Sequence, residues 1–337
     1  MSWFKELTGF EEGGYAETRQ RLKVCGEHLH CNVNGQRWAI GRLETPSLGQ
    51  LRERARSDPQ ASGRLTVRAM ASDAKGLHAH PDSCGALFQV ASQFNLLEML
   101  HHSVTPEDGV TRYEDDPTQG PACAIAAGAA TIYRNYFAPV GGPDGPQGQT
   151  AECQINTLAD LSAALGEGLV DMRNGYALCT AEQLQQINQR VAALTEPERG
   201  ALRDLLRIGL HWDVEVTTAG AGRGQRVSQA LCSALPVAYS QVPAAHWAPL
   251  ARLVLEAAYE ATMWAAVLNA RRGPSNAVYL TLLGGGAFGN DARWIQPAME
   301  RALECVADQD LAVHLVSYRH IPEAFHDLER RYRARRP

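Results

Sequence analysis

The stretch 278-VYLTLLGGGAFGN-290 joins an apolar, β-rich run to four closely spaced glycines. Glycine has no Cβ, so the backbone can turn sharply here or let a ligand come very close. A strand, a glycine turn and a helix N-terminus together present unpaired N–H groups and a positive dipole end. The stretch therefore favours an anion site suited to phosphate. A turn without a ligand is the alternative, although three consecutive glycines are a costly way to build one.

The same glycines spell a familiar dinucleotide pattern, because Gly284, Gly286 and Gly289 fit G-x-G-x-x-G. That pattern would open a six-stranded unit, and too little chain follows to build one. The acidic residue expected roughly 20 positions later, after the next strand, is also missing, since Asp308 and Asp310 precede that strand. No Gly-Lys-Ser/Thr follows, which excludes a P-loop. The general anion site is what remains.

A second group of chemically capable residues follows the apolar run 85–95, which reads as a buried strand and ends in polar side chains. Ligands of open α/β sheets sit beyond the carboxyl ends of strands. The next loop, 104-VTPEDGVTRYEDDPTQGPACA-124, leads into a small-residue helix whose N-terminus could face phosphate or ribose. The carboxylates in and before this loop are Glu98, Glu107, Asp108, Glu114, Asp115 and Asp116.

Two kinds of chemistry would use such carboxylates. Hydrolysis of a glycosidic bond needs a carboxylate to position or activate water. A cationic leaving group such as guanidinium would add a demand for carboxylates of its own. The alternative is a solvated acidic loop, with Asp116 capping the helix that follows.

A possible metal site lies in 25-CGEHLHC-31, where zinc would need four converging ligands. The segment reads as a strand, which puts His28 and His30 on one face and Cys25 and Cys31 on the other. Asn34-Gly35 then marks a hairpin between two strand-like runs. We therefore expect a β-hairpin here and no metal.

Composition narrows the class of protein. The chain has 337 residues, of which 45% are hydrophobic and 20% charged, as in ordinary globular proteins. The net charge of −5 gives no sign of a nucleic-acid or anionic-membrane surface. No signal peptide or membrane span is visible, and eight scattered cysteines without a CxxC pair suit reduced thiols. These features predict a cytoplasmic protein.

The elements that must position these residues alternate along the chain. Thr180 and Gln183 form a capping box before a helix, and Pro297 should fall in the first turn of the helix after the glycine loop. Predicted strands cover 65–72, 85–95, 175–180, 208–216, 227–239, the run into the glycine loop, and 311–318. Predicted helices cover 48–56, 121–137, 181–194, 196–208, 246–270 (largely buried) and about 291–307. This alternation predicts an α/β sandwich around a mixed sheet.

Together the motifs 88-FQVASQFNLLEM-99, 104-VTPEDGVTRYEDDPTQGPACA-124 and LLGGGAFGN resemble an atypical branch of the macrodomain family. That branch includes bacterial effector-type enzymes that remove ADP-ribose from arginine side chains, including those of ubiquitin. The resemblance covers roughly residues 65–320. The usual macrodomain loop has a glycine run after the Asn, whereas this chain has LLEML and an acidic loop, so the usual catalytic rules do not transfer.

The resemblance implies roles within an ADP-ribose site. Asp73 stands where macrodomains place the acid that meets adenine, and Gln93 and Asn95 would bind the distal ribose. Glu98, Asp108, Asp115 and Asp116 would orient water and hold a guanidinium. The remaining implied ligand-binding residues are Thr118, Gln119 and Gly120 for ribose and phosphate, and Gly284, Gly285, Gly286, Ala287, Phe288, Gly289 and Asn290 in the diphosphate loop.

The resulting hypothesis is a macrodomain-like three-layer α/β sandwich that hydrolyses ADP-ribose from proteins, with arginine as the expected linkage and ubiquitin as a candidate substrate. ADP-ribose is the expected ligand, and no cofactor or metal is required. We expect a hairpin/helix extension at 1–64, the catalytic domain at 65–320 with a helical insertion at about 150–270, and a basic C-terminal tail at 321–337, of which 329–337 should be solvated and frayed. The alternatives are a non-catalytic ADP-ribose reader and a hydrolase of free NAD or ADP-ribose nucleotides.

Overall fold

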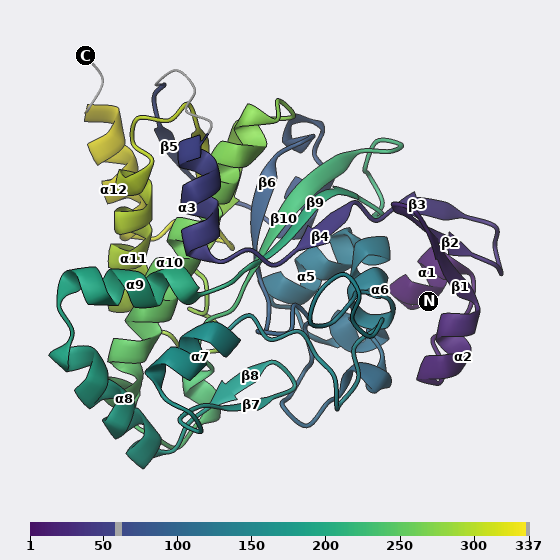
Figure 1. Ribbon diagram of the computed structural model, residues 1–337. Helices are drawn as coiled ribbons and strands as arrows, with labels where there is room; N and C mark the ends of the chain where they lie inside the picture. Colours follow the sequence, from purple (N-terminus) through teal and green to yellow (C-terminus); the bar gives the residue numbers. More distant parts are fainter. Residues whose placement is uncertain (58–62, 335–337) are drawn as a thin grey trace.

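A seven-stranded mixed sheet with helices on both faces forms the centre of the computed structural model, which describes residues 1–57 and 63–334 (Figure 1). β9 runs antiparallel to both of its neighbours, and the strands from β10 to β5 are parallel. The parallel strands therefore all end at one edge of the sheet. In spatial order the strands are β4 (Arg42–Glu44), β9 (Gly209–Glu215), β10 (Arg226–Cys232), β6 (Leu87–Ala91), β11 (Ala277–Leu280), β12 (Ala312–Ser317) and β5 (Thr66–Ala71).

The expected α/β sandwich around a mixed sheet is confirmed. Alternate side chains of each strand point to opposite faces and enter different clusters. On β6, Leu87 packs with the helices of one face, whereas Phe88 and Val90 pack with those of the other. Both faces of this central strand are therefore buried, as its continuous apolar sequence predicts.

One face of the sheet carries the larger helical layer. The long helix α10 is apolar almost all round and largely buried, as predicted, and it packs most extensively on α11. The capping box of Thr180 and Gln183 at the start of α8 is also confirmed. The helices of this layer are α3 (Leu48–Ser57), α7 (Ala159–Leu165), α8 (Ala181–Ala193), α9 (Glu196–Leu205), α10 (Ala244–Arg271), α11 (Ala292–Cys305) and α12 (Glu323–Ala334).

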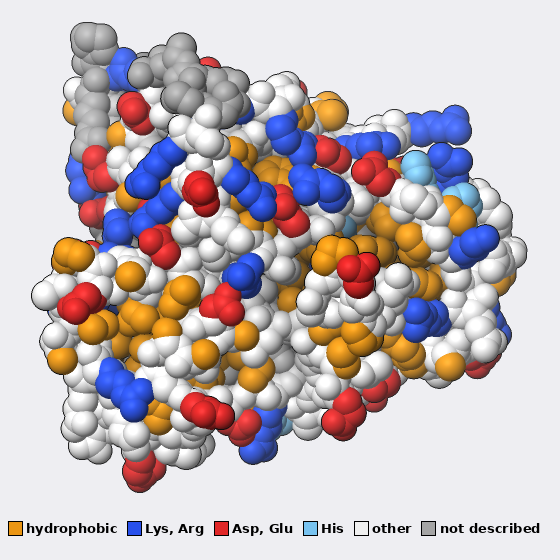
Figure 2. Space-filling view, viewed as in Figure 1, with side chains coloured by type: hydrophobic (Ala, Val, Ile, Leu, Met, Phe, Trp, Pro, Cys, Tyr) orange, Lys and Arg blue, Asp and Glu red, His pale blue; other side chains and the backbone are white. Residues whose placement is uncertain are grey.

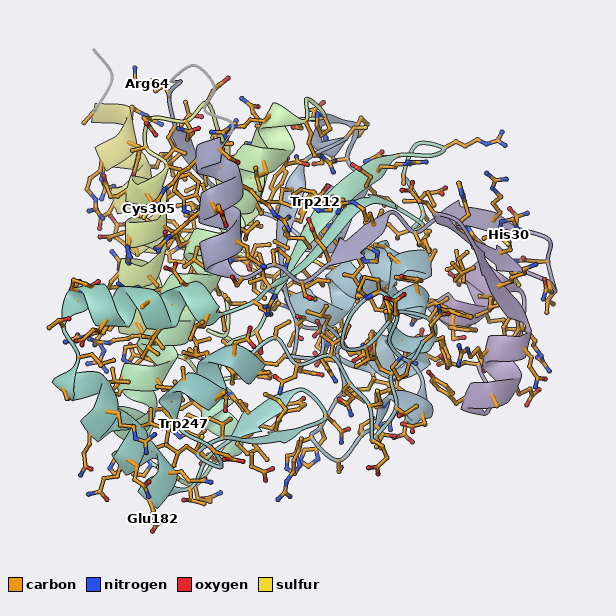
Figure 3. All side chains as sticks on the ribbon, viewed as in Figure 1. His30, Arg64, Glu182, Trp212, Trp247 and Cys305 are labelled. Atoms are coloured by element: carbon orange, nitrogen blue, oxygen red, sulfur yellow. The ribbon has the colours of Figure 1, made fainter. Side chains whose placement is uncertain are left out.

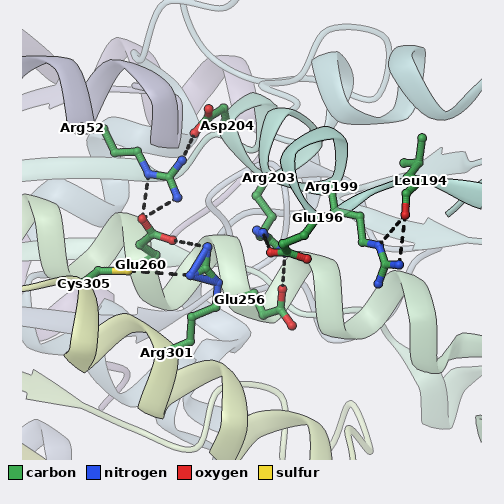
Figure 4. A network of polar contacts seen from close by, with 10 residues as sticks. All are labelled: Arg52, Leu194, Glu196, Arg199, Arg203, Asp204, Glu256, Glu260, Arg301 and Cys305. Carbon is green, nitrogen blue, oxygen red and sulfur yellow. Dashed lines mark hydrogen bonds and ion pairs between the residues drawn. The ribbon is translucent and has the colours of Figure 1, made fainter. Parts of the chain in front are cut away.

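A network of charges ties this layer together (Figure 4). Glu260 of α10 is almost completely buried and pairs with Arg52 of α3 at 2.6 Å and Arg301 of α11 at 3.4 Å. Arg52 also reaches Asp204 of α9 at 2.5 Å. A buried carboxylate needs such partners, so the network fixes how the helices sit against one another. On the outer surface around α3, Figure 2 shows basic and acidic side chains interspersed.

The opposite face carries α4 (Ala74–Ala79), α5 (Gln119–Ala126) and α6 (Gly128–Tyr136). The prediction of a single helix over 121–137 is wrong, because α5 ends before Ala127 and α6 begins after it. The N–H of Gly128 leaves the helical pattern and donates to Thr217 Oγ1 at 2.9 Å. A Cβ at Gly128 would lie 2.8 Å from the Trp3 ring, so glycine at this position lets the N-terminal helix pack closely.

Described elements within residues 1–57 also contribute to this body. β4 forms one edge of the large sheet, and α3 packs on α10. The hairpin at Asn34-Gly35 is confirmed, with β2 and β3 antiparallel. The N-terminal elements are α1 (Trp3–Thr8), α2 (Tyr15–Gln20) and a small sheet of β1 (Leu22–Cys25), β2 (His28–Cys31) and β3 (Arg37–Ala39).

The Cys/His segment of this small sheet lies at the outer end of the molecule, where Figure 3 labels His30. Among the described residues, no group of three or more His, Cys, Asp or Glu side chains is arranged to hold a metal ion. The other short elements are β7 (Asp171–Arg173), β8 (Tyr176–Leu178) and the 3-10 turns η1 (Pro81–Ser83), η2 (Pro106–Asp108), η3 (Thr111–Asp115) and η4 (Val237–Tyr239).

Three further expectations need correction. The basic tail at 321–337, expected to be frayed from residue 329, forms helix α12 up to Ala334, because Phe325, Leu328 and Tyr332 are buried. The strand expected over 227–239 ends at Cys232, and Pro297 lies inside α11, which begins at Ala292. Residues 58–62 of the predicted extension and 335–337 of the predicted tail lie outside the described residues. Within the described part, no helix has the length and apolarity that crossing a membrane requires.

Candidate functional site

A cavity of about 510 Å³ opens at the carboxyl ends of the parallel strands. Each of these strands contributes to its wall: Ser72 follows β5, Ser317 ends β12, Thr281 follows β11, Ser92 follows β6 and Ala234 follows β10. This volume lies in the range of small-molecule sites. Its place at the strand ends is where open α/β sheets bind ligands.

The glycine loop after β11 forms one wall of the cavity. Gly284 has φ +73°, and a Cβ there would lie 2.4 Å from that of Ala234, so only glycine fits this position. The N–H of Asn290 donates to Gly284 O at 2.9 Å, and its side-chain amide donates to Leu235 O at 2.8 Å. Asn290 therefore closes the loop and anchors it to the segment after β10.

The tip of the loop presents unused N–H groups. Gly286, Ala287 and Phe288 line the cavity together with Gly284. In the part of the chain that the structure describes, the N–H groups of Gly286, Ala287 and Phe288 have no hydrogen-bond acceptor. Gly285, Gly289 and Asn290 lie behind the tip, with their N–H groups bonded inside the loop. A row of free N–H groups at a turn suits an anion such as phosphate.

The N-terminus of α5 forms a second wall. Thr118, Gln119 and Gly120 line the cavity, as does Asp116, whose carboxylate accepts the N–H of Thr118 at 2.8 Å. The side-chain amide of Gln119 accepts from Ala91 N–H at 2.8 Å and donates to the Gln89 carbonyl at 3.1 Å. Gln119 thus clamps the start of α5 onto β6, leaving the helix end open to the cavity.

The polar residues after β6 shape the loop that carries Glu98. Gln93 lines the cavity, but its side chain binds both the N–H of Met99, at 2.8 Å, and the carbonyl of Met99, at 2.7 Å. Asn95 is fully buried outside the cavity lining, accepting from Leu97 N–H and donating to Gln154. Both amides, expected from the sequence to bind ribose, are engaged in holding this loop.

Glu98 is the unusual side chain of the site. It lines the cavity with 8% of its surface exposed, and among the described residues its Oε1 has no hydrogen-bond partner. A Cβ on Gly120 would lie 2.4 Å from Glu98 Oε2, so the carboxyl group sits directly against the start of α5. Burial raises the pKa of Glu98 well above its usual range; the charge of Asp116 raises it further and that of Arg134 opposes the shift. Burial therefore favours the protonated form of Glu98.

A buried arginine supports this loop from beneath. Arg134 donates to the carbonyl of Leu96 at 3.1 Å and to Thr131 Oγ1 at 2.9 Å. Leu96 has φ +66°, a conformation that needs such support. Burial lowers the pKa of Arg134 to about 10, so its guanidinium keeps its charge at neutral pH.

The predicted acidic residues separate into two groups. Glu98 and Asp116 line the cavity, whereas Asp108 and Asp115 do not. Asp108 accepts the N–H of Thr105 at 2.8 Å and thereby caps a 3-10 turn. Asp115 is exposed and pairs with Arg112 at 3.5 Å. The structure thus brings two of the four carboxylates together.

The far end of the cavity lies over β5 and β12. Asp73 lines it while capping α4, accepting from Gly76 N–H at 3.0 Å. Tyr318, which follows the neighbouring strand β12, also lines the cavity and is 65% exposed. Sequence reasoning missed Tyr318, although an aromatic residue directly after a parallel strand was a usable signal.

Two further tyrosines were also missed. Tyr176 and Tyr239 line the cavity beside Phe288, with ring centroids 5.4 to 5.6 Å apart. They come from the 150–270 region, whose role was not predicted from the sequence. No local pattern marks either residue, since they meet only through the tertiary fold.

Comparisons with known proteins give distant similarity only. No protein-family model and no curated protein matches the chain. Among solved structures, poly(ADP-ribose) glycohydrolase from Deinococcus radiodurans in complex with ADP-ribose is 15% identical with a TM-score of 0.45, covering 96% of this chain and 98% of that one. Poly(ADP-ribose) glycohydrolase from Thermomonospora curvata is 12% identical with a TM-score of 0.43, covering 94% and 97%. At such low identity and TM-score, the similarity assigns no function to this chain.

Proposed function

We propose that the protein is an ADP-ribosyl hydrolase that removes ADP-ribose from modified protein side chains. The observation that carries the proposal is Glu98, a buried carboxyl group in the wall of a cavity with an oxygen that no described residue pairs. Such a group is costly to bury, and perturbed carboxyl groups in clefts are characteristic of acid–base catalysis. It stands beside a second carboxylate, Asp116, and near two backbone sites for anions.

The order of the strands supports one orientation of the ligand. Asp73 and Tyr318 stand at the β5 and β12 end, where a base could stack on the tyrosine ring. The loop tip Gly286–Phe288 follows at β11 and would bind the diphosphate. Glu98 and Asp116 lie beyond β6, near the place that the distal ribose would then occupy.

Hydrolysis in this arrangement divides the work between two carboxyl groups. Asp116 orients water and takes its proton as the oxygen bonds to the anomeric carbon of the distal ribose. The bond from that carbon to the side-chain atom breaks, and its electron pair leaves with that atom. Protonated Glu98 gives its proton to the leaving group. Asp116 ends protonated and Glu98 ionised, and transfer of that proton between them by way of solvent completes the cycle.

We propose that the ADP-ribose is linked to arginine side chains of cytoplasmic proteins. Ubiquitin is the first candidate substrate to test. A guanidinium leaving group suits this site, because its N–H edges bind the carboxylate of Asp116 well and can also donate to an oxygen of protonated Glu98. When the bond breaks, the electron pair leaves with the nitrogen as neutral guanidine, a strong base that accepts the proton of Glu98.

The test is release of ADP-ribose from arginine-modified ubiquitin by the purified protein, alongside calorimetry with free ADP-ribose. We expect release by the wild type, and binding without release by Glu98→Gln. Binding without release by the wild type would make the protein a reader of ADP-ribose. Release of nicotinamide from NAD with no action on modified protein would make it a hydrolase of free nucleotides.

A further inference from the structure

We infer that the aromatic wall formed by Tyr176, Tyr239 and Phe288 is the leaving-group subsite of the cavity, and that it takes a guanidinium group. This inference rests on the proposed function and deepens it. It assigns the discrimination between arginine and other linkages to side chains that hold no part of the ADP-ribose itself.

The three rings form one continuous surface. The ring centroids of Tyr176 and Tyr239 are 5.4 Å apart, those of Tyr176 and Phe288 are 5.5 Å apart, and those of Tyr239 and Phe288 are 5.6 Å apart. Their planes are inclined by 51°, 44° and 75°, so the rings do not stack on one another. All three line the cavity, and together they offer π faces and edges to a bound group.

The wall is joined to the loop that carries the proposed acid. The hydroxyl of Tyr176 donates to the carbonyl of Met99 at 2.6 Å, and Met99 follows Glu98 in the chain. Burial raises the pKa of Tyr176, and charges on Tyr239, Glu98 and Asp116 raise it further, which places this hydroxyl in the field of both carboxyl groups. Glu98 and Asp116 line the same cavity as the three rings, so a group held against the wall shares that cavity with both carboxyl groups.

The aromatic wall and the two carboxyl groups together favour a planar cation. A guanidinium group stacks its face on aromatic rings while its N–H edge donates to carboxylates. The hydroxyl group of a serine or a sugar gains little from a π face and brings no positive charge to Asp116. Glu98 adds the buried, unpaired oxygen that a passive apolar wall would not need.

Tyr239 is the residue through which to test the subsite. It is 37% exposed, whereas Tyr176 is buried and holds the Glu98 loop. Replacing Tyr239 should therefore disturb the fold least. Tyr239→Leu removes the ring, Tyr239→Phe keeps it, and Tyr318→Leu at the other end of the cavity serves as the matched control.

The experiment compares KM and kcat for ADP-ribose release from an arginine-linked and a serine-linked substrate of the same protein. Tyr239→Leu should raise KM for the arginine linkage by roughly 3- to 30-fold, while Tyr239→Phe stays near the wild type. The serine linkage and the affinity for free ADP-ribose should change little. Tyr318→Leu should weaken both linkages and free ADP-ribose alike.

Equal losses for both linkages in Tyr239→Leu, or equal damage in Tyr239→Phe, would overturn the inference while leaving the hydrolase intact. If the wild type releases ADP-ribose from neither linkage, the proposed function fails instead. Binding of methylguanidine to the ADP-ribose complex, followed by NMR, then decides on the subsite alone. Tighter binding to the wild type than to Tyr239→Leu supports it, and equal binding overturns it.

Discussion

The burial of Glu98 lowers the stability of the folded protein. Its carboxyl group is nine-tenths buried, its Oε1 has no partner among the described residues, and Gly120 approaches it so closely that no side chain would fit there. Selection for stability alone would replace such a group. Its presence in a cavity wall is what a site that stores a reactive proton requires.

This cost predicts a pH-dependent effect on stability. Because burial raises the pKa of Glu98, the folded chain keeps a proton that the unfolded chain loses above the ordinary value of 4.5. The free energy of unfolding must therefore fall as pH rises from 4.5 towards the raised pKa. Urea unfolding at several pH values should show that the free energy of unfolding falls less with rising pH for Glu98→Gln than for the wild type. Identical pH profiles would mean that Glu98 is not protonated in the folded protein.

The adjacent residues Asp115 and Asp116 offer a second test at the residue scale. Only Asp116 lines the cavity, whereas Asp115 pairs with Arg112 on the surface. We expect Asp116→Asn to lower kcat for ADP-ribose release by roughly 100-fold or more, as loss of a general base does. Asp115→Asn should stay within about twofold of the wild type, since exposed ion pairs contribute little. The reverse result would place the chemistry outside the cavity.

At the scale of elements, the glycines of the β11–α11 loop have separate tasks. Gly284 allows the backbone to pass Ala234, whereas a Cβ at Gly286 would meet no atom within 4 Å. The first glycine therefore serves the fold, and the second serves the open surface of the loop.

A matched pair of substitutions tests this division. Gly284→Ala should destabilise the protein by roughly 1–3 kcal/mol, through its positive φ and the overlap with Ala234. Gly286→Ala should leave the free energy of unfolding within about 0.5 kcal/mol. Its Cβ would alter ADP-ribose affinity only if the ligand lies on the loop tip. Chemical denaturation and calorimetry on both variants measure the two effects, and equal destabilisation would contradict the assignment.

The sequence predicts best those features that depend on neighbouring residues in the chain. The glycine loop, the Asn34-Gly35 hairpin and the capping box at Thr180 depend on neighbouring residues, and each appears where expected. The amides of Gln93 and Asn95 were located after the correct strand but expected to bind a ligand. In the folded chain these amides hold the loop of Glu98 through contacts with Met99 and Gln154, which no local pattern marks. Tyr176 and Tyr239 carry no local signal and meet only in three dimensions.

At the scale of the whole molecule, elements near both ends of the described chain belong to the main body. β4 supplies one edge strand of the sheet, and α12 packs beside β5 at the other edge. The basic residues of 329-ERRYRARRP-337 suggested a frayed tail because charge dominates their composition. The apolar spacing of Phe325, Leu328 and Tyr332, which decides the packing of the helix, begins before that basic run.

The integration of α12 is testable through Phe325, which is buried with 1% exposure. Phe325→Ala should lower the free energy of unfolding by roughly 3–5 kcal/mol, as other buried phenylalanines do. Arg333→Ala, on the exposed side of the same helix, should change it by less than about 0.5 kcal/mol. Urea denaturation of the two variants gives both values. A small effect of Phe325→Ala would mean that the helix is dispensable to the fold.

The most direct test of the whole account is a crystal structure of the Glu98→Gln variant with ADP-ribose. We predict the diphosphate against the N–H groups of Gly286–Phe288 and the adenine beside Asp73 and Tyr318. The anomeric carbon of the distal ribose should then face residue 98 and Asp116, with room for a water molecule between. An anomeric carbon at the Asp73 end, or a ligand bound outside the cavity, would contradict the proposed site and its chemistry.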